Sequence, residues 1–81
     1  MDIEATVRTY IAENFAYRGG AADLPASKSL IDAGIVDSTG VLELVSFVEQ
    51  EFGIAVGDTE VVPENFDSIA NLTAYIQRKS A

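Results

Sequence analysis

GIVDSTGVLELVSFVEQEFGI, residues 34–54, is the stretch that decides the fold of this chain. Apolar side chains recur in it at helical spacing from Ser38, or from the residue after it, and they fall on one face of a helix. That face is formed by Val41, Leu44, Val45, Val48 and Phe52. Asp37 or Ser38 can accept the free backbone N–H groups as N-cap, and Gly53 can end the helix. We therefore predict a helix over 38–52 that begins at a hydroxyl beside a carboxylate.

A helix with the same periodicity is predicted at the N-terminus, from about Asp2 to Tyr17. Its acidic first turn suits the positive end of the helix dipole, and Gly19-Gly20 would end it. The apolar face would hold Ile3, Val7, Tyr10, Ile11 and Phe15.

Two connections lack this periodicity. Residues 18–36 form a long loop, and long loops in compact domains are often functional. Three of its apolar side chains, Leu30, Ile31 and Ile35, are expected to fold back onto the core, because water is a poor environment for them. Residues 54–56 are predicted to be a loop that packs back on the core, because a lone strand would have no partner.

The last third of the chain predicts a short helix and a longer one. Pro63 can open a helical turn over Glu64 to Asp67, with Phe66 pointing inward. A final helix starts at Asp67 or Ser68 as N-cap, and its buried stripe is Ile69, Leu72, Tyr75 and Ile76.

These elements predict an all-α fold: a small four-helix bundle of three longer helices and one short third helix, in one domain over 1–81. The predicted core contains Val7, Ile11, Phe15, Ile31, Val41, Leu44, Val45, Val48, Phe52, Ile69, Leu72 and Ile76.

Composition excludes most chemistry that a side chain could perform. The chain has no cysteine and no histidine, so a disulfide, a thiolate metal site and the usual general base are all missing. No apolar run approaches the roughly 20 residues that a membrane span needs, and the acidic N-terminus does not resemble a signal peptide. We expect a cytoplasmic protein that is not an enzyme and holds no metal.

The net charge of −8 is unevenly distributed. Residues 29–77 contain nine acidic residues and no basic one. Such an anionic field disfavours nucleic acids and anionic membranes, and it favours basic protein surfaces.

Ser38 has no equipment to act as a nucleophile, because no imidazole, neighbouring lysine or Gly-x-Ser-x-Gly turn accompanies it. An exposed hydroxyl at a helix start is well placed to be modified by another enzyme. By itself, the Asp37-Ser38 pair fits a simple helix cap better than it fits a modification site.

The surrounding pattern indicates modification. Residues 34–45, followed by Val48-Glu49-Gln50-Glu51-Phe52-Gly53-Ile54, resemble the acyl carrier protein family over nearly the whole chain. The resemblance implies that Ser38, with Asp37 as its motif neighbour, carries a 4′-phosphopantetheine arm taken from coenzyme A by a phosphopantetheinyl transferase. The thiol of that arm would hold acyl cargo as a thioester and present it to partner enzymes, as in lipid or secondary-metabolite biosynthesis.

The resemblance also implies a partner surface on the second helix. Glu43 and Glu49 match acidic positions of the family's recognition helix. The implied partners are a loading ligase, for acyl or aminoacyl groups, and a downstream transferase or synthase with a basic docking surface. A monomer would suit such a shuttle.

Several residues depart from the family pattern. Thr39 replaces the usual leucine or methionine, Gly40 and Gln50 replace acids, and Ser46 replaces a methionine. These changes are expected to alter the docking face and to favour a specialised carrier over a housekeeping one. Phe47 lies on the polar side of the wheel, where it would either cover the long loop or anchor a partner.

Two alternatives stay open. An aminoacyl or peptidyl carrier would use the same arm, since Asp-Ser-x-Gly also occurs in D-alanyl carriers. An unmodified acidic helical adaptor would use Ser38 as a cap only and would bind a basic partner through the second helix.

Overall fold

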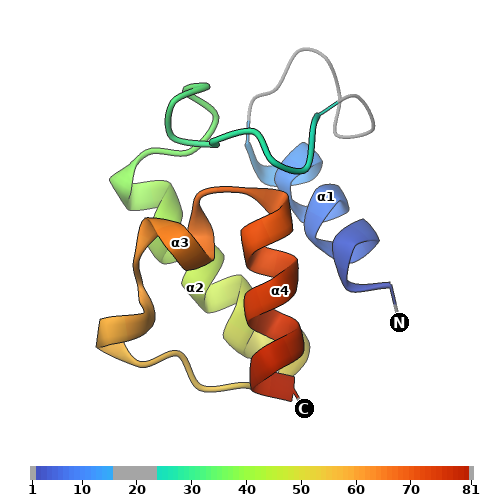
Figure 1. Cartoon of the computed structure of the whole chain (residues 1–81), viewed down its shortest axis with the longest axis vertical. Coiled ribbons are helices and arrows are strands. Elements are labelled where there is room, and N and C mark those ends of the chain that lie inside the picture. Colours follow the sequence, from blue (N-terminus) through green and yellow to red (C-terminus); the bar gives the residue numbers. More distant parts are fainter. Residues whose placement is uncertain (1, 16–23, 81) are drawn as a thin grey trace.

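The computed structural model describes residues 2–15 and 24–80, and these residues form four α-helices, one short 3-10 helix and no strand (Figure 1). The predicted all-α four-helix fold is confirmed.

Helix α2 spans Ser38–Phe52, as the sequence predicts. Asp37 is its N-cap, because the Asp37 carboxylate accepts the Gly40 N–H at 2.7 Å. Gly53 ends the helix with a φ of 66°, a left-handed conformation that favours glycine, and its N–H donates to the Glu49 carbonyl.

Helix α1 spans Ile3–Asn14, and Asp2 caps it by accepting the Ala5 N–H. The predicted end at Tyr17 is wrong, since Phe15 already has extended backbone angles. The Asn14 side-chain amide donates to the Tyr10 carbonyl, which adds a side-chain contact within the last turn. The predicted stop at Gly19-Gly20 lies outside the described residues.

The C-terminal half follows the prediction closely. A 3-10 helix, η2, spans Asp58–Glu60, and the short α3 spans Pro63–Phe66. Helix α4 spans Ile69–Ser80, and the Ser68 hydroxyl accepts the Asn71 N–H at its start. Residues 54–56 are irregular, as expected for a loop.

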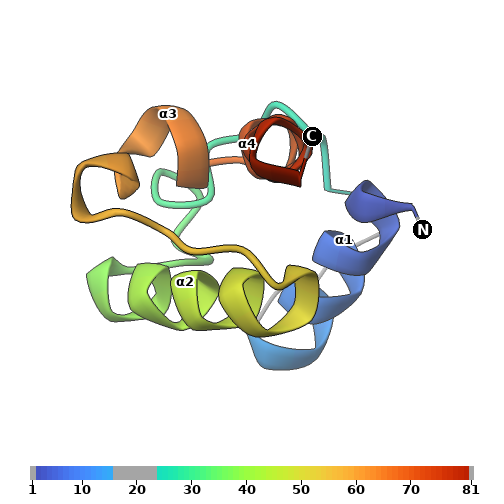
Figure 2. The ribbon, with the colours of Figure 1, turned by 90° about the horizontal axis from the view of Figure 1, so that it is seen from below.

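Helix α4 contacts each of the other three helices. Seen from below, α2 forms one side of the molecule, and α3 and α4 lie on the other (Figure 2). The core between them is formed by Val7, Ile11, Leu24, Leu30, Ile35, Val36, Leu44, Val48, Phe66, Ile69, Leu72, Tyr75 and Ile76. The predicted Phe15, Val41, Val45 and Phe52 are only partly buried and pack against this core.

Ile31 was expected in the core, and this expectation is wrong, because its side chain is 45% exposed. The cause is a long-range pairing of its loop. The Asp67 carboxylate accepts the Ile31 N–H and the Ser29 hydroxyl, and the Asp67 carbonyl accepts the Leu30 N–H. These bonds turn Leu30 inward and Ile31 outward.

Candidate functional site

Ser38 is the first residue of α2, and it is exposed together with both of its neighbours, Asp37 and Thr39. The cap is made by the Asp37 side chain and not by Ser38. The Ser38 hydroxyl is therefore not needed to start the helix. Because the first N–H groups of a helix lack intrahelical acceptors, the surroundings of this hydroxyl carry partial positive charge.

An apolar groove of about 640 Å³ opens beside Ser38. The loop contributes Ile31 and Val36 to it, and α2 contributes Val41 and Leu42. The third wall consists of Val61 and Val62, from the segment that leads into α3, and of Pro63 and Phe66 from α3 itself. Sequence reasoning missed this groove, because its walls are far apart in the chain.

The exposed face of α2 carries an apolar side chain that the sequence analysis did not single out. Leu42 is 65% exposed and lies one turn after Ser38. Its spacing from Ser38 could have identified it, because four residues later is the same side of a helix.

The two predicted partner acids, Glu43 and Glu49, are both exposed but do not come together. The two residues are six positions apart in the helix, so their side chains point in directions about 120° apart. Glu43 shares a surface hollow with Thr39, next to the end of α1. Glu49 instead accepts the Val56 N–H at 3.0 Å, so it holds the loop that follows α2.

Phe47 packs on α1. Its ring stacks on Tyr10, with centroids 3.9 Å apart and planes 15° apart, and it meets Phe52 edge-on. The sequence predicted that Phe47 would cover the long loop or anchor a partner, and neither role anticipated this contact with Tyr10. Burial, and secondarily the charge of Glu43, raises the pKa of Tyr10.

Gly40 is buried, which corrects its expected place on the docking face. A Cβ at this position would lie 2.8 Å from a Phe15 ring carbon and 3.0 Å from a Val36 methyl. Glycine at this position allows α2 to approach the end of α1. The family commonly has an acid at this position, and the close packing of α2 against the end of α1 explains why this chain has glycine instead.

A model of the phosphopantetheine attachment site family matches residues 5–76. The chain belongs to this carrier-protein family. A probable acyl carrier protein, PigG, from a Serratia species is 32% identical over 79 residues, which are 98% of this chain and 90% of that relative. The D-alanyl carrier protein of Abiotrophia defectiva is 36% identical over 53 residues, 65% of this chain and 67% of its own. Aminoacyl carrier protein 2 of Bradyrhizobium diazoefficiens is 34% identical over 72 residues, 89% of this chain and 75% of its own.

The protein is thus a carrier with a phosphopantetheine arm, whose thiol holds acyl-type cargo as a thioester. Carriers of this family are not catalytic themselves, and they work with phosphopantetheinyl transferases and with loading or synthase enzymes. The adaptor without an arm is not favoured.

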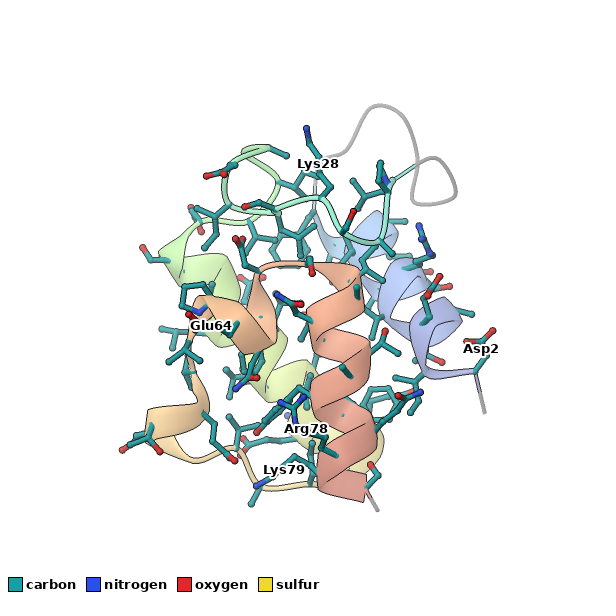
Figure 3. The ribbon with its side chains drawn as sticks, viewed as in Figure 1. Asp2, Lys28, Glu64, Arg78 and Lys79 are labelled. Atoms are coloured by element: carbon teal, nitrogen blue, oxygen red, sulfur yellow. The ribbon has the colours of Figure 1, made fainter. Side chains whose placement is uncertain are left out.

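Three basic residues of the carrier lie at the ends of the molecule. Lys28 lies at one end of the molecule, and Arg78 and Lys79 lie at the other (Figure 3). Helix α2 carries no basic residue along its length. Within the described residues, no helix is long and apolar enough to span a bilayer, and no metal-binding group of acidic side chains is found.

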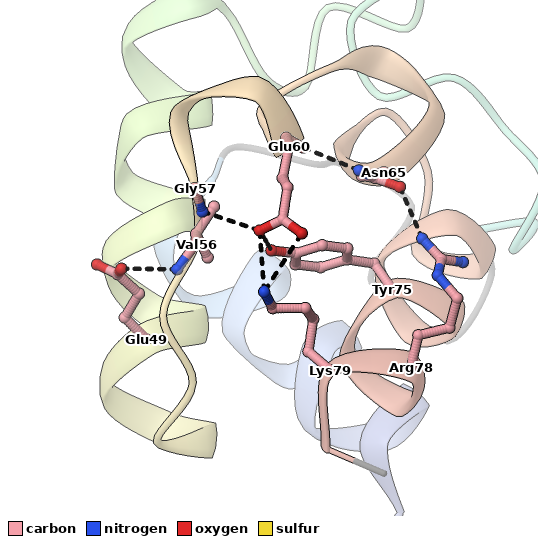
Figure 4. Close-up of polar contacts among 8 residues, drawn as sticks. All are labelled: Glu49, Val56, Gly57, Glu60, Asn65, Tyr75, Arg78 and Lys79. Carbon is pink, nitrogen blue, oxygen red and sulfur yellow. Dashed lines mark hydrogen bonds and ion pairs between the residues drawn. The ribbon is translucent and has the colours of Figure 1, made fainter.

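A cluster of polar contacts in the carrier centres on Glu60 (Figure 4). Its carboxylate accepts the Gly57 N–H at 2.9 Å and the Tyr75 hydroxyl at 3.0 Å, and it forms an ion pair with Lys79 at 3.0 Å. The Gly57 amide, then Lys79 and Tyr75, lower the pKa of Glu60. Burial, and then the Glu60 carboxylate, raise the pKa of Tyr75 to about 12.

The Tyr75 shift predicts loss of stability in alkali. Because the raised pKa favours the neutral phenol in the folded state, its contribution is complete below the ordinary pKa of 10 and disappears as the pH rises to about 12. Tyr75→Phe should make the free energy of unfolding less dependent on pH in this window, as measured by urea titrations. The pKa of Tyr10 is raised as well, although by a smaller shift, so Tyr10→Phe should flatten this dependence less, and an equal flattening by both variants would contradict the assignment to Tyr75.

Proposed function

We propose that Ser38 is the residue that carries the phosphopantetheine arm. The supporting observation is its place: an exposed hydroxyl on the first turn of α2, at the rim of an apolar groove and inside the matched region. Two other serines are engaged elsewhere. The Ser29 hydroxyl donates to Asp67 at 2.6 Å, and Ser68 is buried and caps α4.

The position of Ser38 suits a phosphodiester. A phosphate on its hydroxyl would lie at the N-terminus of a 15-residue helix, where the backbone N–H groups and the helix dipole favour an anion. Asp37 keeps its capping bond to Gly40 in this arrangement. The attached group therefore does not compete with the contact that starts the helix.

Attachment would proceed by substitution at phosphorus. The Ser38 Oγ forms a bond to the pantetheine-bearing phosphorus of coenzyme A, and the bond from that phosphorus to the adenosine bisphosphate breaks. The hydroxyl proton passes to a base on the transferase, which also binds the magnesium ion. We infer that the chain is not itself an enzyme, because its sequence offers no histidine or cysteine to supply such a base or nucleophile.

The partner surface is proposed to be the exposed side of α2 around Ser38. Thr39 and Glu43 lie on one flank of it, and Leu42 follows Ser38 on the helix. Glu49 contributes charge at the far end. Phe47 stacks on Tyr10, so it would touch a partner only at the exposed edge of its ring.

Charge removal on this surface should weaken encounter with a basic partner. Glu43→Gln should raise the KM of a phosphopantetheinyl transferase for the carrier by about two- to five-fold, equal to about 0.5–1 kcal/mol, with little change in kcat. The effect should shrink as salt is added. Glu49→Gln should have a smaller effect, because Glu49 is partly engaged with Val56.

The control for this comparison is Glu51→Gln. Glu51 is exposed on the same helix but borders the hollow between α1 and Phe47. An equal rise in KM for Glu43→Gln and Glu51→Gln would show that only net charge matters, and that no defined surface exists around Ser38.

The remaining features follow from the same proposal. We propose that residues 1–81 form one carrier domain, that this domain is monomeric and works in the cytoplasm, and that its cargo is an acyl group.

Incubation with coenzyme A, magnesium and a broad-specificity transferase should add one phosphopantetheine group, and fragmentation mass spectrometry should locate it on Ser38. Addition at another serine would overturn the proposal. Loading tests with acyl and aminoacyl ligases would then separate the two cargo classes.

A further inference from the structure

The Glu60 cluster joins a segment of little regular structure to α4. Residues 53–62 contain only the single turn η2, so side-chain bonds largely determine where this segment lies. Glu60 supplies most of these bonds through Tyr75 and Lys79. Tyr75 is only 1% exposed and packed in the core, which makes it a fixed point of attachment.

The chain continues from this segment directly into one wall of the groove. Val61 and Val62 follow Glu60 directly and line the groove beside Ser38. The Glu60 carbonyl also accepts the Val62 N–H and the Asn65 side-chain amide, and Asn65 in turn accepts a bond from Arg78. Glu60 thus fixes this wall to α4 from both its side chain and its backbone (Figure 4).

The opposite wall is fixed separately. Asp67 holds the loop that carries Ile31, through bonds to the Ile31 N–H and the Ser29 hydroxyl. Displacement of the segment that contains Glu60 would therefore change the width of the groove without releasing the loop. The groove would change shape on the side that faces Leu42 and Ser38.

We propose that Glu60 is a positioning residue for the carrier function: it holds the Val61–Val62 wall in place, so that the groove can receive an aliphatic acyl chain carried on Ser38 of the same molecule. This inference rests on the proposed attachment at Ser38. Tethering makes the binding intramolecular, so that even a shallow apolar groove is occupied at a high effective concentration. The carboxylates of Asp37 and Asp67, which border the groove, disfavour an anionic cargo there.

The test compares loaded forms of the carrier. A broad-specificity transferase with acetyl-coenzyme A or octanoyl-coenzyme A gives the two acyl forms, and intact mass confirms complete loading. The readout is the difference in Tm between octanoyl and acetyl forms, because a chain that binds the folded state stabilises it. The variants are Glu60→Ala and Glu60→Gln, and the matched control is Glu64→Ala, which removes an exposed carboxylate of α3.

The octanoyl form of the wild type should melt above the acetyl form, and Glu64→Ala should keep the full difference. Glu60→Ala should lose more than half of it. Glu60→Gln should be intermediate, since its amide oxygen can still accept the Gly57 N–H and the Tyr75 hydroxyl but lacks the ion pair with Lys79. If Glu60→Ala does not fold, Glu60→Gln decides the comparison.

A purely structural role would lower the Tm of all forms equally. The inference is overturned if the deciding Glu60 variant keeps the wild-type difference, or if the wild type shows no difference between the two chains. Failure of the proposed function is a separate observation, because the wild type would then gain no mass at Ser38. That result would overturn both statements before any melting is measured.

Discussion

Ser38→Ala should abolish loading completely while leaving the fold intact. The substitution removes the oxygen that would form the bond to phosphorus, and no engaged serine nearby can replace it. Stability should change by no more than about 0.5 kcal/mol, because Asp37 and not Ser38 caps α2. Intact mass after incubation with coenzyme A, magnesium and a transferase measures the first effect, and urea unfolding measures the second.

Two controls separate attachment from capping. Ser46→Ala removes another exposed hydroxyl of α2 and should load normally. Asp37→Ala should cost about 1 kcal/mol of stability through loss of the cap, although the hydroxyl of Ser38 remains. Full loading of Ser38→Ala would refute the attachment site, and failure of this variant to fold would show that Ser38 has a structural role.

The helices were predictable because their signals are local. Asp37 and Gly53 mark the two ends of α2 within the sequence itself, and the apolar spacing between them reports a helix face. The proposed attachment at Ser38 rests on a signal of the same kind, since its motif is contiguous with the helix. The end of α1 was not, because the side chain of Phe15 leaves the helix to pack near Gly40.

The parts that sequence reasoning missed depend on contacts between distant residues. Ile31 is exposed because Asp67, 36 positions later, binds its backbone. Glu60 is one of the nine acidic residues within 29–77, yet its carboxylate binds Tyr75 and Lys79, which lie 15 and 19 positions away. Neither pairing leaves a periodic trace in the sequence, so the groove beside Ser38 could not be foreseen.

The burial of Gly40 shows how a family pattern can mislead when it is applied residue by residue. The absence of an acid at this position suggests a weaker docking face if the helix is considered alone. In the folded chain the position faces the Phe15 ring and the Val36 side chain. The charge of the proposed docking face would therefore come from Glu43 and Glu49, and specialisation of this carrier is better sought at Thr39, Leu42 and Ser46, which are exposed.

Gly40→Asp should consequently destabilise the carrier and should not create a stronger docking face. The new Cβ would lie 2.8 Å from the Phe15 ring, and its carboxylate would be buried near that of Asp37, only 3.4 Å from the Cβ. Overpacking costs about 1–3 kcal/mol, and burial of an unpaired charge adds to it, whereas the gain in helix propensity over glycine is below about 1 kcal/mol. We expect a net loss of about 2–4 kcal/mol in urea unfolding.

The matched control is Ser46→Asp, which adds the same charge to an exposed position of α2. It should change the free energy of unfolding by less than about 0.5 kcal/mol. Gly40→Ala isolates the steric part, because it adds the Cβ without the charge. If Gly40→Asp were as stable as Ser46→Asp and also lowered the KM of a transferase, then α2 would present Gly40 to partners, and the close approach of Phe15 would not limit this position.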